Sequence, residues 1–258
     1  MDSEICKVKM TIIPSQEDTL YIPIGRGVRN SNILDIQGDI FTDKYQNKYI
    51  SVKVLPEKSV TVLREFTIHP PKPDITPNIC LSNNERFCKW KEDGYIKELV
   101  NENIDLSNKD KITTFINIIK QIKYSYPRTK YEYTDEILEK NLPQDCLGYH
   151  GTLCSLLRCS NIPSVVDIGI RLTGNDKPHV WLWYYNTEEN DWYMIDINDI
   201  KDNVTNPLRL SFTIGTTHNI NLHTASYVQY FVSENMLRKE LQKPHSMKIE
   251  LVKRKTDI

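Results

Sequence analysis

The chain has 258 residues, of which 39% are hydrophobic and 26% charged, and its formal net charge at pH 7 is −1. This composition is ordinary for a globular protein and excludes wholesale disorder, and the balanced charge argues against a nucleic-acid partner. The first residues are acidic and polar, and no run reaches the ~20 apolar residues of a membrane span, so we expect no signal peptide, no membrane partner and a cytoplasmic location.

Cysteines in that compartment are expected to stay reduced. None belongs to a C-x-x-C pair, His218 and His223 have no third ligand at a usual spacing, and no acidic calcium loop is recognisable. We therefore predict no metal and no cofactor. The six cysteines are Cys6, Cys80, Cys88, Cys146, Cys154 and Cys159.

The first 68 residues have the period-two alternation of β-strands. Four proline residues then fall within eight positions, and proline fits neither a strand ladder nor a helix interior. We predict a β-sandwich-like domain over residues 1–68, a proline-rich linker over 69–77 and a second domain over 78–258. The expected strands are residues 7–14, 20–24, 48–55 and 60–68, with turns at 25–27, 30–32 and 43–47.

The second domain begins with helical periodicity and ends in strands. Apolar residues at 3.6-residue spacing predict a helix over residues 110–124, with Ser107 and Asp110 resembling a capping box. Shorter helices are expected at 134–140 and 146–159, followed by strands at 165–172, 179–185, 192–197, 208–214 and 226–232, a helix at 233–241 and a strand at 247–252.

Cys146 is the first candidate for chemistry. Asp145 is a good N-cap, and Leu153 and Leu157 lie on the apolar face of the helix that follows. A cysteine in the first helical turn has its thiolate stabilised by free amides and the helix dipole. The alternative is a buried structural thiol, which is what we expect of Cys154 and Cys159.

His179 and Asp196 supply a base and the group that orients it. The segments around them flank a polar turn at residues 186–191 and predict an antiparallel hairpin. If Trp183 lies opposite Trp192, His179 lies opposite Asp196, and the carboxylate can hold the imidazole in one tautomer. The alternative is a core hairpin with an incidental histidine at its edge. His150, four residues after Cys146, is a rival base or else a packing residue.

Three blocks resemble the transglutaminase-like superfamily. They are the helix Asp145-Cys146 to Ile162-Pro163, the segment His179-Val180-Trp181, and Trp192 followed four residues later by Asp196. The resemblance covers about residues 110–200 and implies an α+β, papain-like core, with the nucleophile helix packed on an antiparallel sheet and preceded by a small β-domain. The chain departs from the family pattern at His150, where a small residue is common, at Asn161 for glycine and at Ile197 for proline.

The resemblance also implies a catalytic triad. Cys146 is the expected nucleophile, His179 the general base and acid, and Asp196 the orienter. The expected reaction is attack on an amide of a peptide or protein substrate to form a thioester, which water or an amine then releases. The alternative is a catalytically silent copy of the fold that acts as a protein-interaction module.

Overall fold

The computed structural model describes residues 5–33, 38–83, 85–172, 177–205, 208–215, 232–233 and 246–255. By internal contacts the chain divides into two compact units, and each is described by itself. The first takes in residues 1–71, 168–178 and 208–258, and the second residues 72–167 and 179–207. Both units are discontinuous in the chain, and the predicted division at residues 69–77 into separate domains stays a prediction. Within the described residues, no helix has the length and apolar character to cross a membrane.

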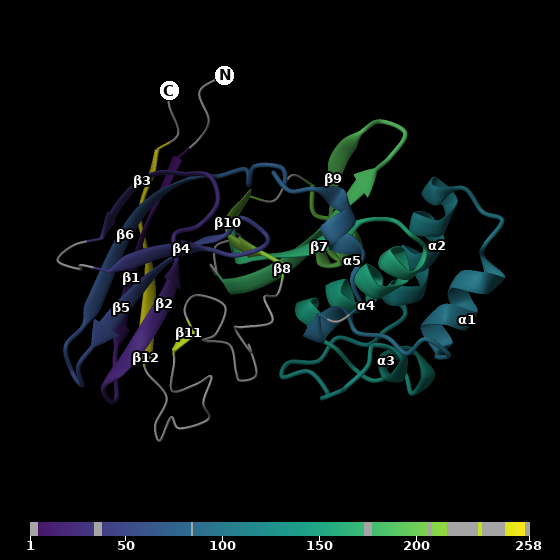
Figure 1. Ribbon diagram of the computed structural model, residues 1–258, viewed down its shortest axis with the longest axis horizontal. Helices are drawn as coiled ribbons and strands as arrows, with labels where there is room; N and C mark the ends of the chain where they lie inside the picture. The colour runs from purple at the N-terminus through teal and green to yellow at the C-terminus, as the bar shows by residue number, and fades with distance from the viewer. Residues whose placement is uncertain are drawn as a thin grey trace. The chain divides into compact units, whose positions relative to one another are not determined.

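The first unit is built from β-strands in two four-stranded sheets (Figure 1), ordered β12-β1-β6-β3 and β11-β2-β5-β4. Strand β6 buries every second residue, so one face of its sheet meets the core. Residues from both sheets join one hydrophobic cluster that includes Val8, Val62, Leu20 and Val52. The strands of these two sheets are β1 Ile5–Ile13, β2 Asp18–Pro23, β3 Val28–Ile33, β4 Asp39–Thr42, β5 Lys48–Val54, β6 Val60–Thr67, β11 Val232–Ser233 and β12 Ser246–Lys255. Strand β10 Leu208–Ile214 is also in this unit but belongs to a third sheet.

The four strands predicted in this region are confirmed within two residues at each end, but two strands were missed. Residues 30–32 were expected to form a turn, and they lie in β3, which pairs antiparallel with β6. Ladder hydrogen bonds to a neighbour override the weak strand propensity of Asn30, Ser31 and Asn32. Most of the strand predicted at 226–232 and nearly all of the helix predicted at 233–241 lie outside the described residues.

The second unit holds the helices and the end of a hairpin. Its elements are the 3₁₀ helices η1 Pro77–Leu81 and η2 Arg86–Cys88, the helices α1 Tyr95–Glu102, α2 Asn108–Lys120, α3 Asp135–Glu139, α4 Cys146–Cys159 and α5 Ile197–Asp202, and strand β9 Asp191–Ile195. Strands β7 Ser164–Leu172 and β8 Lys177–Asn186 contribute residues to both units, in a sheet of order β10-β7-β8-β9. Helix α2 has the predicted Ser107 cap but ends at Lys120, four residues earlier than expected.

Helix α4 is the centre of the second unit and has the predicted limits. The Asp145 carboxylate accepts hydrogen bonds from the amides of Leu147 and Gly148, and every residue from Leu147 to Arg158 is buried. After the helix, Asn161 adopts a left-handed φ of 60°, and the Ile162 amide donates to the Leu157 carbonyl. Asparagine tolerates this conformation better than most residues, which explains how it can stand where glycine is common.

Gly151 lets η2 lie directly on α4. A methyl group at this position would lie 2.2 Å from the carbonyl oxygen of Phe87. Because that neighbour is backbone, we expect Gly151→Ala to destabilise the protein by about 1–3 kcal/mol through overpacking. Urea denaturation against Cys159→Ala on the same helix measures the difference. Stabilisation of the kind seen for Gly→Ala in open helices, about 1 kcal/mol, would contradict the close packing.

Candidate active site

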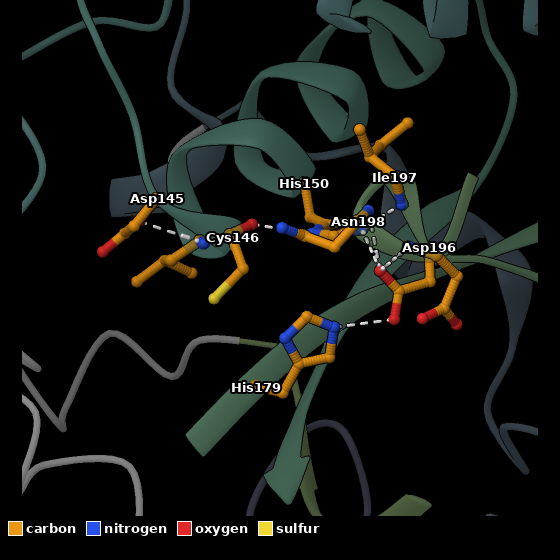
Figure 2. A network of polar contacts seen from close by, with 9 residues as sticks. Asp145, Cys146, His150, His179, Asp196, Ile197 and Asn198 are labelled. Carbon is orange, nitrogen blue, oxygen red and sulfur yellow. Dashed lines mark hydrogen bonds and ion pairs between the residues drawn. The ribbon is translucent and has the colours of Figure 1, made fainter. Parts of the chain in front are cut away.

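Three elements of the second unit each present one residue of the predicted triad (Figure 2). Cys146 is the first residue of α4, His179 lies in β8, and Asp196 is the N-cap of α5. His179 and Asp196 are buried, and Cys146 is half-buried. A nucleophile held together with a buried base and carboxylate is the arrangement expected of a covalent catalyst.

His179 and Asp196 are in direct contact. The distance from His179 Nε2 to Asp196 Oδ2 is 2.7 Å, and Asp196 Oδ1 accepts hydrogen bonds from the amides of Asn198 and Asp199. A carboxylate oxygen can only accept here, so Nε2 of His179 carries the proton. The other ring nitrogen, Nδ1, is then the basic atom.

The predicted hairpin register is wrong, although the contact that it was used to predict is present. Trp183 pairs with Met194 and Tyr185 with Trp192, a shift of two residues from the expected pairing of Trp183 with Trp192. A two-residue shift keeps each side chain on its face of the sheet, because the strand period is two. β9 ends at Ile195, and the chain turns into α5, so Asp196 reaches His179 as a helix cap rather than as a strand residue.

The side chain of Cys146 points toward the ring of His179 (Figure 2). Figure 2 shows it pointing to the side of the ring on which Nδ1 lies, away from Asp196. Burial, followed by the charge of Asp145, raises the pKa of the Cys146 thiol to about 12, while the amides of Val180 and Leu147 oppose the rise. Burial and the charge of Asp145 therefore oppose the stabilisation of the thiolate that was expected from the helix start. The thiol stays neutral near pH 7 and needs a base to take its proton.

Asp145 has two functions at the start of α4. Its Oδ1 caps the helix, and its Oδ2 forms an ion pair of 3.0 Å with Arg128 Nη1. Arg128 had no recognisable motif in the sequence, because it lies 17 residues before Asp145 in an irregular segment. The carboxylate that gives the nucleophile helix its start also opposes ionisation of the cysteine that follows it.

Replacing Asp145 by asparagine is expected to lower the pKa of Cys146, because the cap acceptor remains and the negative charge is lost. One pKa unit changes the thiolate fraction up to tenfold, so iodoacetamide should alkylate Cys146 about three to ten times faster at pH 9. Peptide mass spectrometry measures the rate, with Cys159 in the same digest as the internal control. An unchanged or slower rate at Cys146 would show that Asp145 does not set its pKa.

His150 is not placed as a base. It is completely buried, and its Nδ1 lies 2.6 Å from the carbonyl oxygen of Cys146. Its Nε2 accepts a hydrogen bond of 3.0 Å from the amide of Ile197. A carbonyl can only accept and an amide can only donate, so His150 is neutral, with its proton on Nδ1. Of the two interpretations left open by the sequence, the packing residue is the one that the geometry supports.

Other candidates lie apart from this arrangement. Gln144, two residues before Cys146, is buried, and its side-chain amide donates to the Thr129 carbonyl. Cys154 is buried against Ser164.

Tyr124, which the sequence did not single out, is half exposed. Burial, and then the charges of Cys146 and Asp145, raise the pKa of its hydroxyl group. His69 is exposed, while His218, His223 and His245 lie outside the described residues. Across the part of the chain that the structure describes, no three His, Cys, Asp or Glu side chains gather as a metal site.

Comparison with solved structures shows the fold. A candidate cysteine protease from Cytophaga hutchinsonii matches with a TM-score of 0.63 at 12% identity, over 100% of this chain and 93% of that one. The periplasmic domain of TgpA from Pseudomonas aeruginosa gives a TM-score of 0.44 at 12% identity, over 75% of this chain and 88% of that one. LapG from Legionella pneumophila gives a TM-score of 0.36 at 17% identity, over 55% of this chain and 83% of that one. No protein-family model and no curated protein matches the sequence. The first likeness shows that the chain shares the fold of that protein, an α+β fold as predicted from the sequence.

Proposed function

We propose that the protein is a cysteine-dependent acyl-transfer enzyme that acts on an amide of a peptide or protein through a thioester on Cys146. The observation that carries the proposal is the orientation of His179. Its Nε2 is bound to Asp196 at 2.7 Å, which leaves Nδ1 as the basic atom on the side of the Cys146 sulfur. A nucleophile, a base and an orienting carboxylate in this order are the elements of covalent acyl transfer.

The neutral thiol determines the first step. Because the pKa of Cys146 is about 12, we infer that Nδ1 of His179 takes the thiol proton as the sulfur attacks the substrate carbonyl. The imidazolium that forms is stabilised by Asp196, whose carboxylate is held by two backbone amides. The sulfur–carbon bond forms, the carbonyl electrons move to oxygen, and a tetrahedral oxyanion results.

The second step returns the proton. Collapse of the oxyanion breaks the carbon–nitrogen bond, and the imidazolium gives its proton to the leaving amine, so that a thioester and a neutral base remain. The free amide of Cys146 at the start of α4 is the natural donor to the oxyanion. Water or a second amine, deprotonated by His179, then attacks the thioester, which gives hydrolysis or transamidation and restores the thiol.

A peptide library tests the proposed reaction. The wild-type protein and Cys146→Ala are incubated with a proteome-derived peptide mixture and a labelled primary amine, and mass spectrometry identifies new termini and amine adducts. We expect products that appear only with the wild-type protein. New termini indicate hydrolysis, and adducts indicate transamidation. Identical product lists for the two proteins would contradict the proposal.

A silent fold that binds a protein partner is the second candidate, and the raised pKa of Cys146 is the observation that favours it. A structural thiol has no need of a base, so in this case the reactivity of Cys146 toward an acyl donor would not depend on His179. The two functions therefore differ in a property that can be measured without knowing the natural substrate.

A further inference from the structure

A buried hydrogen-bonded link joins the nucleophile to the carboxylate, and His150 is its centre. The imidazole donates from Nδ1 to the carbonyl of Cys146 and accepts at Nε2 from the amide of Ile197, the residue directly after Asp196. These partners lie 4 and 47 residues away along the chain. The His150 side chain thus links the backbone of Cys146 to the backbone of Ile197, the neighbour of Asp196.

The His150 ring also lies close to the side chains of Asp196 and His179. His150 Nε2 is 3.7 Å from Asp196 Oδ1, and the rings of His150 and His179 meet edge to face with centroids 6.3 Å apart. Asp196 Oδ1 is the oxygen held by the amides of α5, so the ring of His150 closes the side of the carboxylate that His179 does not use. Figure 2 shows this order from Cys146 through His150 to Asp196.

We propose that His150 is a positioning residue, which acts as a neutral imidazole to hold the Cys146 and Asp196–Ile197 backbones in register and so keeps the Asp196 carboxylate on Nε2 of His179. The inference rests on the proposed function, because it gives His150 a task within the same triad. It also connects two departures from the family pattern. A small residue at position 150 would remove the acceptor, and a proline at position 197 would remove the amide that donates to it.

His150 is completely buried. Loss of either partner therefore leaves a buried polar group without its hydrogen bond, which is unfavourable. That penalty is relieved by movement of the chain at Cys146 or at Asp196. A displacement of about 1 Å at a reacting group can cost ~10²-fold in rate, so the triad is sensitive to this link even though His150 touches no substrate.

Ile197→Pro breaks the link at its far end without altering His150. Ile197 is the first residue of α5, where proline is well tolerated, and Asp196 before it has φ −129° and ψ 109°, which suits a residue preceding proline. Ile197→Val keeps the amide and a similar volume and is the matched control. His150→Phe removes both hydrogen bonds, and His150→Gln restores a donor and an acceptor.

The readouts are the ¹H–¹⁵N imidazole spectrum and the rate at which p-nitrophenyl acetate acetylates Cys146. In the wild-type protein we expect His150 protonated on Nδ1 alone and His179 protonated on Nε2. His150→Phe and Ile197→Pro should each shift the His179 Nε2–H resonance and slow acetylation by about 10- to 100-fold. His150→Gln and Ile197→Val should keep the resonance and most of the rate.

Two results would overturn the inference. One is a wild-type His150 that carries its proton on Nε2 or on both nitrogens. The other is an unchanged His179 resonance in Ile197→Pro and His150→Phe. If His150→Phe does not fold, the wild-type tautomer and Ile197→Pro still decide. A wild-type protein that is never acetylated on Cys146 would count against the proposed function, while the imidazole spectra would still decide the link.

Discussion

Replacing His179 by alanine is expected to slow the acylation of Cys146 by about 10²- to 10⁴-fold, the range that a positioned acid–base group typically contributes. The reason is the state of the nucleophile. Burial and the charge of Asp145 raise the pKa of Cys146 to about 12, so almost none of it is thiolate at pH 7 without a proton acceptor. Stopped-flow measurement of nitrophenolate release from an active ester gives the rate.

The pH dependence separates this mechanism from a preformed ion pair. A thiol whose pKa is raised gains thiolate only as the pH rises toward that pKa, so in His179→Ala the rate should increase steadily with pH up to about 10. In the wild-type protein Nδ1 of His179 takes the thiol proton during attack, so the rate should depend less steeply on pH over the same range. His69→Ala, at an exposed histidine, is the control. Equal rates in His179→Ala and wild type would remove His179 from the mechanism.

The second large effect concerns stability. Arg158 is buried in α4, and its guanidinium donates to the carbonyls of Ser164 and Ser82 and lies 3.1 Å from the carboxylate of Glu85. Burial opposes the charge, but nearby Cys154 and Glu85 raise the pKa of Arg158, so the residue stays protonated. Removing one partner of such a buried pair typically costs about 3–5 kcal/mol.

We therefore expect Arg158→Met to lower the free energy of unfolding by about 3–5 kcal/mol, measured by urea denaturation. Lys140→Met is the matched control, because it removes an exposed ion pair with Glu136 that contributes about 0.3–0.5 kcal/mol. Adding Glu85→Gln to Arg158→Met should recover part of the loss, because the uncompensated charge is then removed. A loss of under 1 kcal/mol in Arg158→Met would contradict this account of the α4 environment.

The nucleophile helix could be predicted from sequence because its signals are local. Asp145 is a strong N-cap, and the apolar face of the segment has helical spacing, so both limits of α4 were found. The contact of His179 with Asp196 was also found, but Asp196 makes it as the N-cap of α5 and not as a strand residue opposite His179. The register of the β8–β9 hairpin was not predicted correctly, because the aromatic residues of the two strands permit more than one pairing and the turn is four residues long.

The missed features depend on contacts between distant residues. Strand β3 exists because β6 pairs with it, and its polar residues resemble a turn. Helix α5 had a usable signal, since Asp196 followed by Asp199 is typical of a helix start, yet the run of apolar residues favoured a longer strand. The raised pKa of the Cys146 thiol and the hydrogen bonds of His150 had no signal in the sequence, because both depend on groups that come together only in the folded chain.

Trapping the thioester is the most direct test of the account. The protein is mixed with excess p-nitrophenyl acetate, the release of nitrophenolate is followed, and the quenched protein is mapped by mass spectrometry, with Cys146→Ala in parallel. The account predicts a rapid release of about one equivalent and a single acetyl group on Cys146. Equal slow release from both proteins, or acetyl groups spread over Cys159 and lysine residues with none on Cys146, would contradict it.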